Sequence, residues 1–144
     1  MGARRGAGEN GRVAAMSSTQ SLRVLVADDQ PAFRALARQM LAGVAGEVIE
    51  CGDGTEAVAD FERCPADWVL LDWAMPGLDG LAAARAIRVR HPQARIVLIS
   101  SHLTPMLERE AAAAGVFGSF PKERLHEVIA LLRAQSSNSN RIQS

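Results

Sequence analysis

Residues 68–80 of this 144-residue chain read Trp-Val-Leu-Leu-Asp-Trp-Ala-Met-Pro-Gly-Leu-Asp-Gly. The first four residues form an apolar run that ends at Asp72, and a helical pattern begins near Gly80 and stops before Pro92. A continuous apolar run without polar alternation is typical of a strand that is buried on both faces. The segment therefore predicts a buried strand, a loop that begins with a carboxylate, and a helix.

The same alternation of short apolar runs and helical patterns continues in both directions along the chain. Further strands are predicted at 22–27, 48–51, 96–99 and 116–120. Helices are predicted at 31–41, 53–61, 80–90, 104–115 and 125–132. Strands that alternate with helices and are joined by short connections favour a parallel sheet with right-handed crossovers. We therefore predict an α/β fold, a doubly wound five-stranded parallel sheet with helices on both faces.

The chain divides into one predicted domain and two polar tails. Residues 1–20, rich in Gly, Arg and Ser, are predicted to be a disordered N-terminal tail, and residues 136–144 a disordered C-terminal tail. The domain between them, 21–135, carries twelve basic and fifteen acidic residues, whereas the whole chain has no formal net charge. The neutral total is therefore the sum of an acidic domain and basic tails.

The composition disfavours several classes of protein. The sequence has no Lys/Arg-rich run and no apolar run of the ~18 residues that a membrane span needs, so we expect neither direct nucleic-acid binding nor membrane insertion. Arg4 and Arg5 are not followed by an apolar stretch, so no secretory signal is predicted. Cys51 and Cys64 lack metal-binding spacing, and the three histidines are dispersed. We expect reduced thiols and a cytoplasmic protein.

Five polar side chains follow the predicted strands at their carboxyl ends. They are Asp28, Asp29, Asp72, Ser100 and Lys122. Ligands of open α/β sheets bind beyond the carboxyl ends of the strands, so we expect these side chains to share one site. Three carboxylates that repel one another suit Mg²⁺, and a carboxylate can also be the nucleophile that forms an aspartyl-phosphate. Metal and ammonium would offset the charge of a transferring phosphoryl group.

The chain resembles a receiver domain of a bacterial two-component response regulator over about residues 21–133. The resemblance rests on Val26–Gln30, on Leu70–Gly80, on Ile99–Ser101 and on Ala114–Gly115 through Lys122. The string Asp-x-x-Met-Pro-x-x-Asp-Gly is the most specific of these motifs. Segments 91–102 and 118–123 are most similar to receivers that carry a helix-turn-helix output. The resemblance implies a flavodoxin-like fold with strand order 2-1-3-4-5.

The resemblance also implies a magnesium site and a phosphoacceptor. Asp72 matches the carboxylate that accepts the phosphoryl group and also contacts the metal. Asp28 and Asp29 match the acidic pair that holds Mg²⁺, with Asp29 as the direct ligand. The backbone carbonyl of Ala74 matches a further ligand, so its side chain need not be polar.

Two more positions match the switch of these receivers, and one departs from it. Ser100 matches the switch hydroxyl that binds a phosphoryl oxygen, and Lys122 matches the lysine that pairs with the phosphate. Ser119 stands where Tyr or Phe is usual, so the coupling between hydroxyl and aromatic ring is in doubt, although Phe117 or Phe120 is a candidate substitute. Lys122 is also the single lysine among sixteen basic residues.

The implied function is a phosphorylation switch. A histidine kinase or phosphotransfer protein would phosphorylate Asp72, and the face formed by segments 104–115, 116–120 and 125–132 would change and serve a partner or a homodimer. Such a domain catalyses only its own transfer and dephosphorylation, so we do not expect an enzyme with a separate substrate. An aspartyl-phosphate phosphatase would need a second Asp at Ala74. A receiver-like interaction module that is not phosphorylated stays the alternative, as do a stand-alone receiver and a fragment of a longer regulator.

Overall fold

The structure, a computed structural model, describes residues 22–143, with side chains up to residue 136. Its strands are β2 (Arg23–Ala27), β3 (Glu47–Cys51), β4 (Trp68–Asp72), β5 (Ile96–Ser100) and β6 (Gly118–Pro121). Its helices are α1 (Pro31–Met40), α2 (Gly54–Arg63), α3 (Gly80–Arg90), α4 (Pro105–Ala113), the short 3-10 helix η3 (Lys122–Arg124) and α5 (Leu125–Gln143). The predicted disordered N-terminal tail, 1–20, lies outside the described residues.

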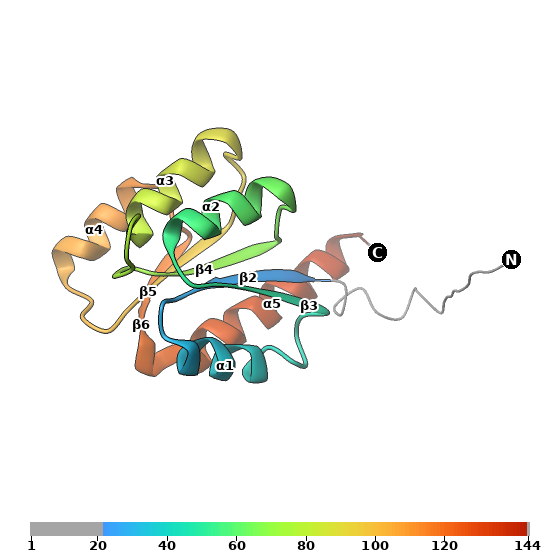
Figure 1. Cartoon of the computed structure of the whole chain (residues 1–144). Helices are drawn as coiled ribbons and strands as arrows, with labels where there is room; N and C mark the ends of the chain where they lie inside the picture. Colours follow the sequence, from blue (N-terminus) through green and yellow to red (C-terminus); the bar gives the residue numbers. More distant parts are fainter. Residues whose placement is uncertain (1–21, 144) are drawn as a thin grey trace, which may run out of the picture.

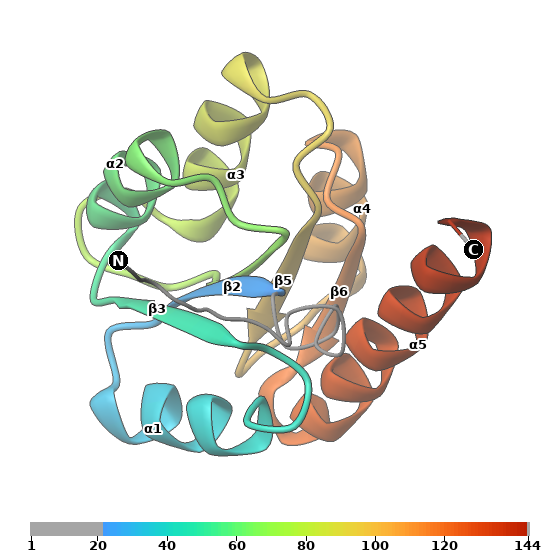
Figure 2. The same cartoon turned by 90° about the vertical axis from the view of Figure 1, so that its right-hand side faces the viewer.

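The five strands form one parallel sheet in the order β3-β2-β4-β5-β6. In chain order this is second, first, third, fourth and fifth, which confirms the predicted topology. Helices α1 and α5 cover one face, and α2, α3 and α4 cover the other (Figures 1 and 2). The central strands β4 and β5 are buried at every residue because both faces are covered.

Two apolar cores lie on either side of the sheet because successive strand residues point to opposite faces. Leu25, Leu71 and Leu98 belong to the core beneath α2, α3 and α4. Val26 and Ile99 belong to the core that α1 and α5 complete. Short apolar strands thus supply both cores at once and hold their carboxyl ends side by side.

The helices begin where the sequence indicates. Asp53, Asp79 and Thr104 each accept a hydrogen bond from a backbone N–H in the first turn of α2, α3 and α4. Pro31 and Pro105 occupy the first turn of α1 and α4, where a missing N–H has no consequence.

The structure differs from the sequence prediction at the last strand and the last helix. Strand β6 is Gly118–Pro121, so it begins two residues later than the predicted strand 116–120. Helix α5 continues to Gln143, whereas a disordered tail was predicted for 136–144. This stretch is polar but has no Pro or Gly to end a helix, and Ser136 is only 9% exposed. Extending an anchored helix is much easier than starting one. No helix in the described range is long and apolar enough to cross a membrane.

Candidate functional site

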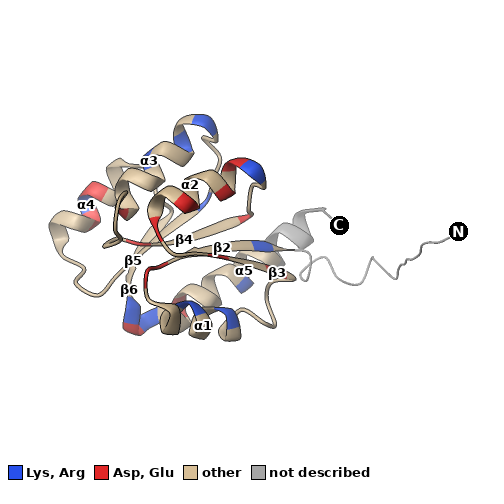
Figure 3. Ribbon diagram, in the orientation of Figure 1, with Lys and Arg blue, Asp and Glu red and all other residues tan. Residues whose placement is uncertain are grey.

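The carboxyl ends of four strands meet at one cleft, as the sequence predicts. Asp72 and Ser100 are the last residues of the paired strands β4 and β5, while Asp28 follows β2 and Lys122 follows β6. Figure 3 shows the acidic turn after β2 and the basic turn after β6 at the same end of the sheet. The cleft is lined by Asp29, Gln30, Asp72, Trp73, Ala74, Ser100, Ser101, His102 and Lys122.

Three carboxylates face one another in this cleft. Asp28, Asp29 and Asp72 each offer an oxygen, and these oxygens all lie within 4.8 Å of one another. Asp28 is 1% exposed and Asp72 5% exposed, whereas Asp29 is exposed. Burying an anion is unfavourable unless a cation or hydrogen-bond donors compensate for the lost water. The cluster therefore needs positive charge.

Lys122 supplies part of that charge. Its Nζ lies 2.7 Å from Oδ2 of Asp28 and 3.6 Å from Oδ2 of Asp72. The same ammonium donates to Oε1 of Gln30 at 3.2 Å and lies 4.7 Å from the centre of the Phe33 ring. One cation thus stands between two buried carboxylates, and the same ammonium contacts neighbours on α1 and the turn before it.

A single ammonium does not balance three carboxylates. Burial, together with the charges of Asp28 and Asp29, raises the pKa of Asp72 to about 6, although Lys122 opposes the rise. Oδ2 of Asp28 is the one fully buried side-chain oxygen or nitrogen in the described part of the chain that makes no hydrogen bond of regular geometry. Its close contact with Lys122, at 2.7 Å, is therefore mainly electrostatic.

These residues fit Mg²⁺. The ion prefers a small number of carboxylate oxygens together with carbonyl oxygens and water. The cleft offers three carboxylates from two turns of the chain, one of them exposed and one with an oxygen that lacks a regular hydrogen bond. The donor set contains no thiol or imidazole among the three converging groups, which disfavours zinc.

Two glycines in the loop after Asp72 stand where a side chain would be strained or would clash. Gly77 has a φ of +75°, a conformation that side chains with a Cβ rarely adopt. A Cβ on Gly80 would lie 2.4 Å from the carbonyl oxygen of Asp72, so only glycine lets α3 begin this close to β4. Asp79 caps α3 through Ala82 N–H at 2.8 Å. The loop thereby turns back beneath Asp72 and leaves its carboxylate at the cleft.

Ser100 and its neighbours form the opposite wall. Ser100 is 2% exposed, and its Oγ accepts a hydrogen bond from the N–H of His102 at 3.0 Å. Ala74 and His102 both line the cleft beside the Asp72 carboxylate. A phosphoryl group on Asp72 would therefore have Ser100 and Lys122 as neighbouring donors.

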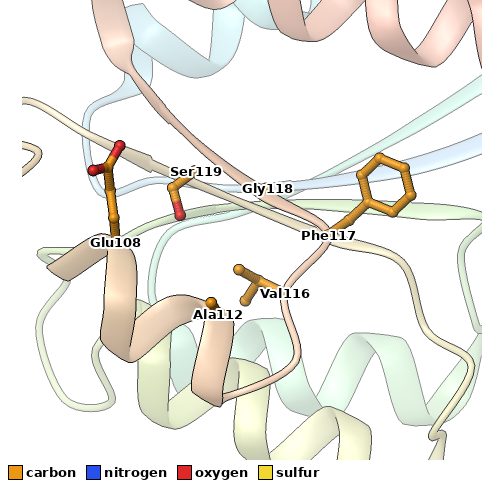
Figure 4. A pocket seen from close by; sticks show the side chains of 6 residues that line it. All are labelled: Glu108, Ala112, Val116, Phe117, Gly118 and Ser119. Atoms are coloured by element: carbon orange, nitrogen blue, oxygen red, sulfur yellow. The ribbon is translucent and has the colours of Figure 1, made fainter. Parts of the chain in front are cut away.

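Neither aromatic candidate lies where it could replace the ring missing at Ser119. Ser119 lines a pocket next to α4 together with Glu108, Ala112, Val116, Phe117 and Gly118, and the Phe117 ring points away from the Ser119 side chain (Figure 4). Phe117 packs edge-on against Trp68, with ring centres 5.0 Å apart. Phe120 packs in the core on the α1–α5 side of the sheet. The usual pairing of switch hydroxyl and aromatic ring is therefore absent among the described residues around Ser119.

Three residues around the acidic turn were not predicted to have a role at the site. Gln30 and Phe33 contact the ammonium of Lys122, and Arg34 donates to the backbone carbonyl of Asp28 at 2.7 Å. Gln30 was part of a quoted motif and Phe33 of a helix face, but no periodicity or spacing distinguishes a contact with Lys122. Only the packing of α1 against the sheet edge reveals them.

Comparison with known proteins identifies the family. The family model described as "Response regulator receiver domain" matches residues 24–133. The probable transcriptional regulatory protein NarL of Mycobacterium tuberculosis is 36% identical over 106 residues, which cover 72% of this chain and 49% of NarL. The cyclic di-GMP phosphodiesterase response regulator RpfG of Xanthomonas campestris pv. campestris is 34% identical over 122 residues, covering 81% of this chain and 31% of RpfG.

A solved structure agrees with these matches. The signal receiver domain of the putative response regulator NarL from Mycobacterium tuberculosis superimposes with a TM-score of 0.74 at 32% identity, covering 81% of this chain and 96% of that one. The chain spans about half or less of the length of the curated relatives named above. The match to a transcriptional regulator agrees with the predicted relationship to receivers of the helix-turn-helix output branch. The chain belongs to the response regulator receiver domain family.

Proposed function

We propose that the chain is a phosphoacceptor switch in which Asp72 receives a phosphoryl group from a histidine kinase or phosphotransfer protein in the presence of Mg²⁺. The observation that carries the proposal is the meeting of Asp28, Asp29 and Asp72 within 4.8 Å, beside the ammonium of Lys122. A purely structural cluster of this kind would carry unfavourable charge repulsion with no compensating use.

The transfer needs little covalent chemistry from the protein. A carboxylate oxygen of Asp72 attacks the phosphorus of a phosphohistidine, forming an acyl phosphate. The phosphorus–nitrogen bond breaks, and its electron pair stays on the donor imidazole. The protein's part is to position the nucleophile and to stabilise charge on the phosphoryl oxygens. Lys122, 3.6 Å from Asp72, and Ser100, at the end of the next strand, stand where they can bind those oxygens.

The metal would be held by Asp28, Asp29, Asp72 and the backbone carbonyl of Ala74. When bound, Mg²⁺ neutralises carboxylate charge and the charge on the phosphoryl oxygens. Asp72 must be ionised to attack, and its raised pKa shows that the metal-free cleft disfavours the ionised form. Mg²⁺, as a second cation beside Lys122, would therefore stabilise the folded cleft and favour the ionised form of Asp72.

The readout would be the face formed by α4, β6 and α5, through a partner or a homodimer. Ser100 ends β5, which pairs with β6, and α4 packs beside β6. A cytoplasmic location follows from the expected kinase partner. The family match concerns the receiver domain and does not identify the output of the whole protein. Ser119 supports a second candidate, an interaction module that is not phosphorylated, since the aromatic partner of the switch is missing.

Mass spectrometry distinguishes the two candidates. The chain is incubated with a small acyl phosphate and Mg²⁺, and a gain of one phosphoryl group is expected. The gain should disappear in Asp72→Asn and in excess EDTA. A parent chain that stays unmodified, while a known receiver is labelled under the same conditions, would favour the interaction module.

A further inference from the structure

The turn that carries Asp28 and Asp29 is held from outside the cleft by Arg34. This residue lies on α1, and its side chain is 21% exposed. Nη1 of Arg34 donates to the backbone carbonyl of Asp28 at 2.7 Å, and Nε donates to Oε1 of Glu50 on β3 at 3.2 Å. One guanidinium therefore joins the acidic turn, the first helix and the edge strand.

The contact with the Asp28 carbonyl controls the direction of Asp29. The carbonyl of Asp28 and the N–H of Asp29 belong to one planar peptide unit, so fixing the carbonyl fixes where Asp29 begins. Asp28 is also held through its N–H, which donates to Cys51 at 3.0 Å, and through Oδ1, which accepts from the N–H of Gln30 at 2.8 Å. The Asp29 side chain is exposed and makes no such contact among the described residues.

Glu50 keeps Arg34 in place. Its carboxylate accepts from Arg34 and also from Nε of Arg38 at 2.5 Å, and these two guanidinium groups hold the pKa of Glu50 below its usual range. A guanidinium presents donors in fixed, diverging directions, so Arg34 can reach a carboxylate and a carbonyl at once. A lysine at this position has one compact ammonium and would serve one of the two acceptors well.

We infer that Arg34 is a positioning residue for the metal: anchored by Glu50, it orients the Asp28–Asp29 peptide so that the Asp29 carboxylate points at the cation site. This inference rests on the proposed function, because it concerns binding of Mg²⁺ in the same cleft. It adds to the proposed metal site a residue that lies outside the cleft, and it connects Glu50 on β3 to the metal ligands through Arg34. Groups that orient metal ligands typically change metal affinity by 10–100-fold when they are mutated.

Arg38 provides a matched control on the same helix. It shares the Glu50 carboxylate, and its Nη2 donates to the carbonyl of Val48 at 3.0 Å, but within the described residues it makes no hydrogen bond to Asp28. Arg34→Ala and Arg38→Ala each remove one positive charge and one ion pair with Glu50. Only the first releases the acidic turn.

The test is a calorimetric Mg²⁺ titration of the full chain, supported by the fluorescence of Trp73, which lines the cleft. Thermal unfolding in EDTA reports general damage separately. Arg34→Ala is expected to weaken Mg²⁺ binding by about 10-fold. Arg34→Lys and Glu50→Gln are expected to fall between it and the parent, and Arg38→Ala to match the parent.

Four results would overturn the inference. The first is an Arg34→Ala protein that binds Mg²⁺ as tightly as the parent. The second is an Arg38→Ala protein whose binding is weakened equally, which would assign the effect to Glu50 or to general stability. If Arg34→Ala does not fold, Arg34→Lys and Glu50→Gln carry the test, and parent-like binding in both overturns it. A parent chain that binds no Mg²⁺ overturns the proposed function together with the inference, whereas the other outcomes leave the phosphoacceptor intact.

Discussion

Replacing Asp72, the proposed phosphoacceptor, by asparagine should make the metal-free protein more stable. Asp72 is 5% exposed, and burial together with the neighbouring carboxylates raises its pKa to about 6 from the 3.8 of a free carboxyl. Between these two values the folded state binds more protons than the unfolded state. Stability therefore falls as the pH rises through this window, and the loss is complete above about pH 7.

The size of the effect follows from the same two values. A pKa raised from 3.8 to about 6 corresponds to about 3 kcal/mol of unfolding free energy lost at pH 7.5. This penalty already includes the attraction to Lys122 at 3.6 Å, and the amide keeps part of the burial cost of a polar group, so we expect Asp72→Asn to gain about 1–3 kcal/mol. The gain should shrink toward zero near pH 4, where the carboxyl is protonated in the folded state.

Urea unfolding followed by circular dichroism measures this difference. The parent and Asp72→Asn are compared at pH 7.5 in EDTA, with Glu123→Gln as the control because it removes one charge at an exposed position on η3. Saturating Mg²⁺ should reduce the advantage of the variant, since metal bound to the folded parent stabilises it. An Asp72→Asn protein that is no more stable than the parent in EDTA at pH 7.5 would refute the electrostatic account of the cleft.

Three further predictions test the metal site, the loop and the lysine. Asp29→Ala should weaken Mg²⁺ binding at least tenfold, because even the loss of a group that only orients a metal ligand costs about 10–100-fold. A Trp73 fluorescence titration with Mg²⁺ that is the same in the variant and the parent would remove Asp29 from the metal site. Gly80→Ala should lower the unfolding free energy by about 1–3 kcal/mol because its Cβ would strike backbone, while Gly43→Ala, with no atom within 4 Å, should not; equal denaturation midpoints would contradict this. Lys122→Arg should fold, with normal circular dichroism, but accept or transmit the phosphoryl group poorly, because the planar guanidinium is larger than the ammonium; normal labelling and normal partner binding would make the lone lysine a coincidence.

The convergence of the site was predictable from the sequence because it depends on topology alone. Asp72 and Ser100 end neighbouring strands, and the parallel arrangement follows from the alternation of buried strands with helices. No side-chain geometry is needed to infer that residues ending such strands lie together. The contacts of Gln30 and Arg34 are different, since they depend on how α1 leans against the sheet edge, and nothing in a one-dimensional pattern encodes that angle.

The predicted end of the last helix differs from the structure for a related reason. Composition predicted a polar tail from residue 136 onward, but the helix begins in a strongly apolar segment, and Leu132 is fully buried. Continuation then depends on the absence of a stop signal rather than on the presence of apolar residues. The prediction relied on the polarity of residues 136–144, whereas the length of α5 depends on propagation from its anchored first turns.

The two adjacent carboxylates show what a sequence motif leaves open. The residue pattern by itself does not distinguish Asp28 from Asp29, since both follow the same strand, and only the family resemblance implied Asp29 as the direct ligand. In the structure, Asp28 continues the hydrogen-bonding of β2 through Cys51, is buried, and has a carboxylate occupied by Gln30 and Lys122. Asp29 comes one residue later, beyond the end of β2, and its side chain lies exposed at the mouth of the same cleft. A carboxylate that the protein leaves exposed can adjust to an arriving ion, and this asymmetry favours Asp29 over Asp28 as the direct ligand in the proposed metal site.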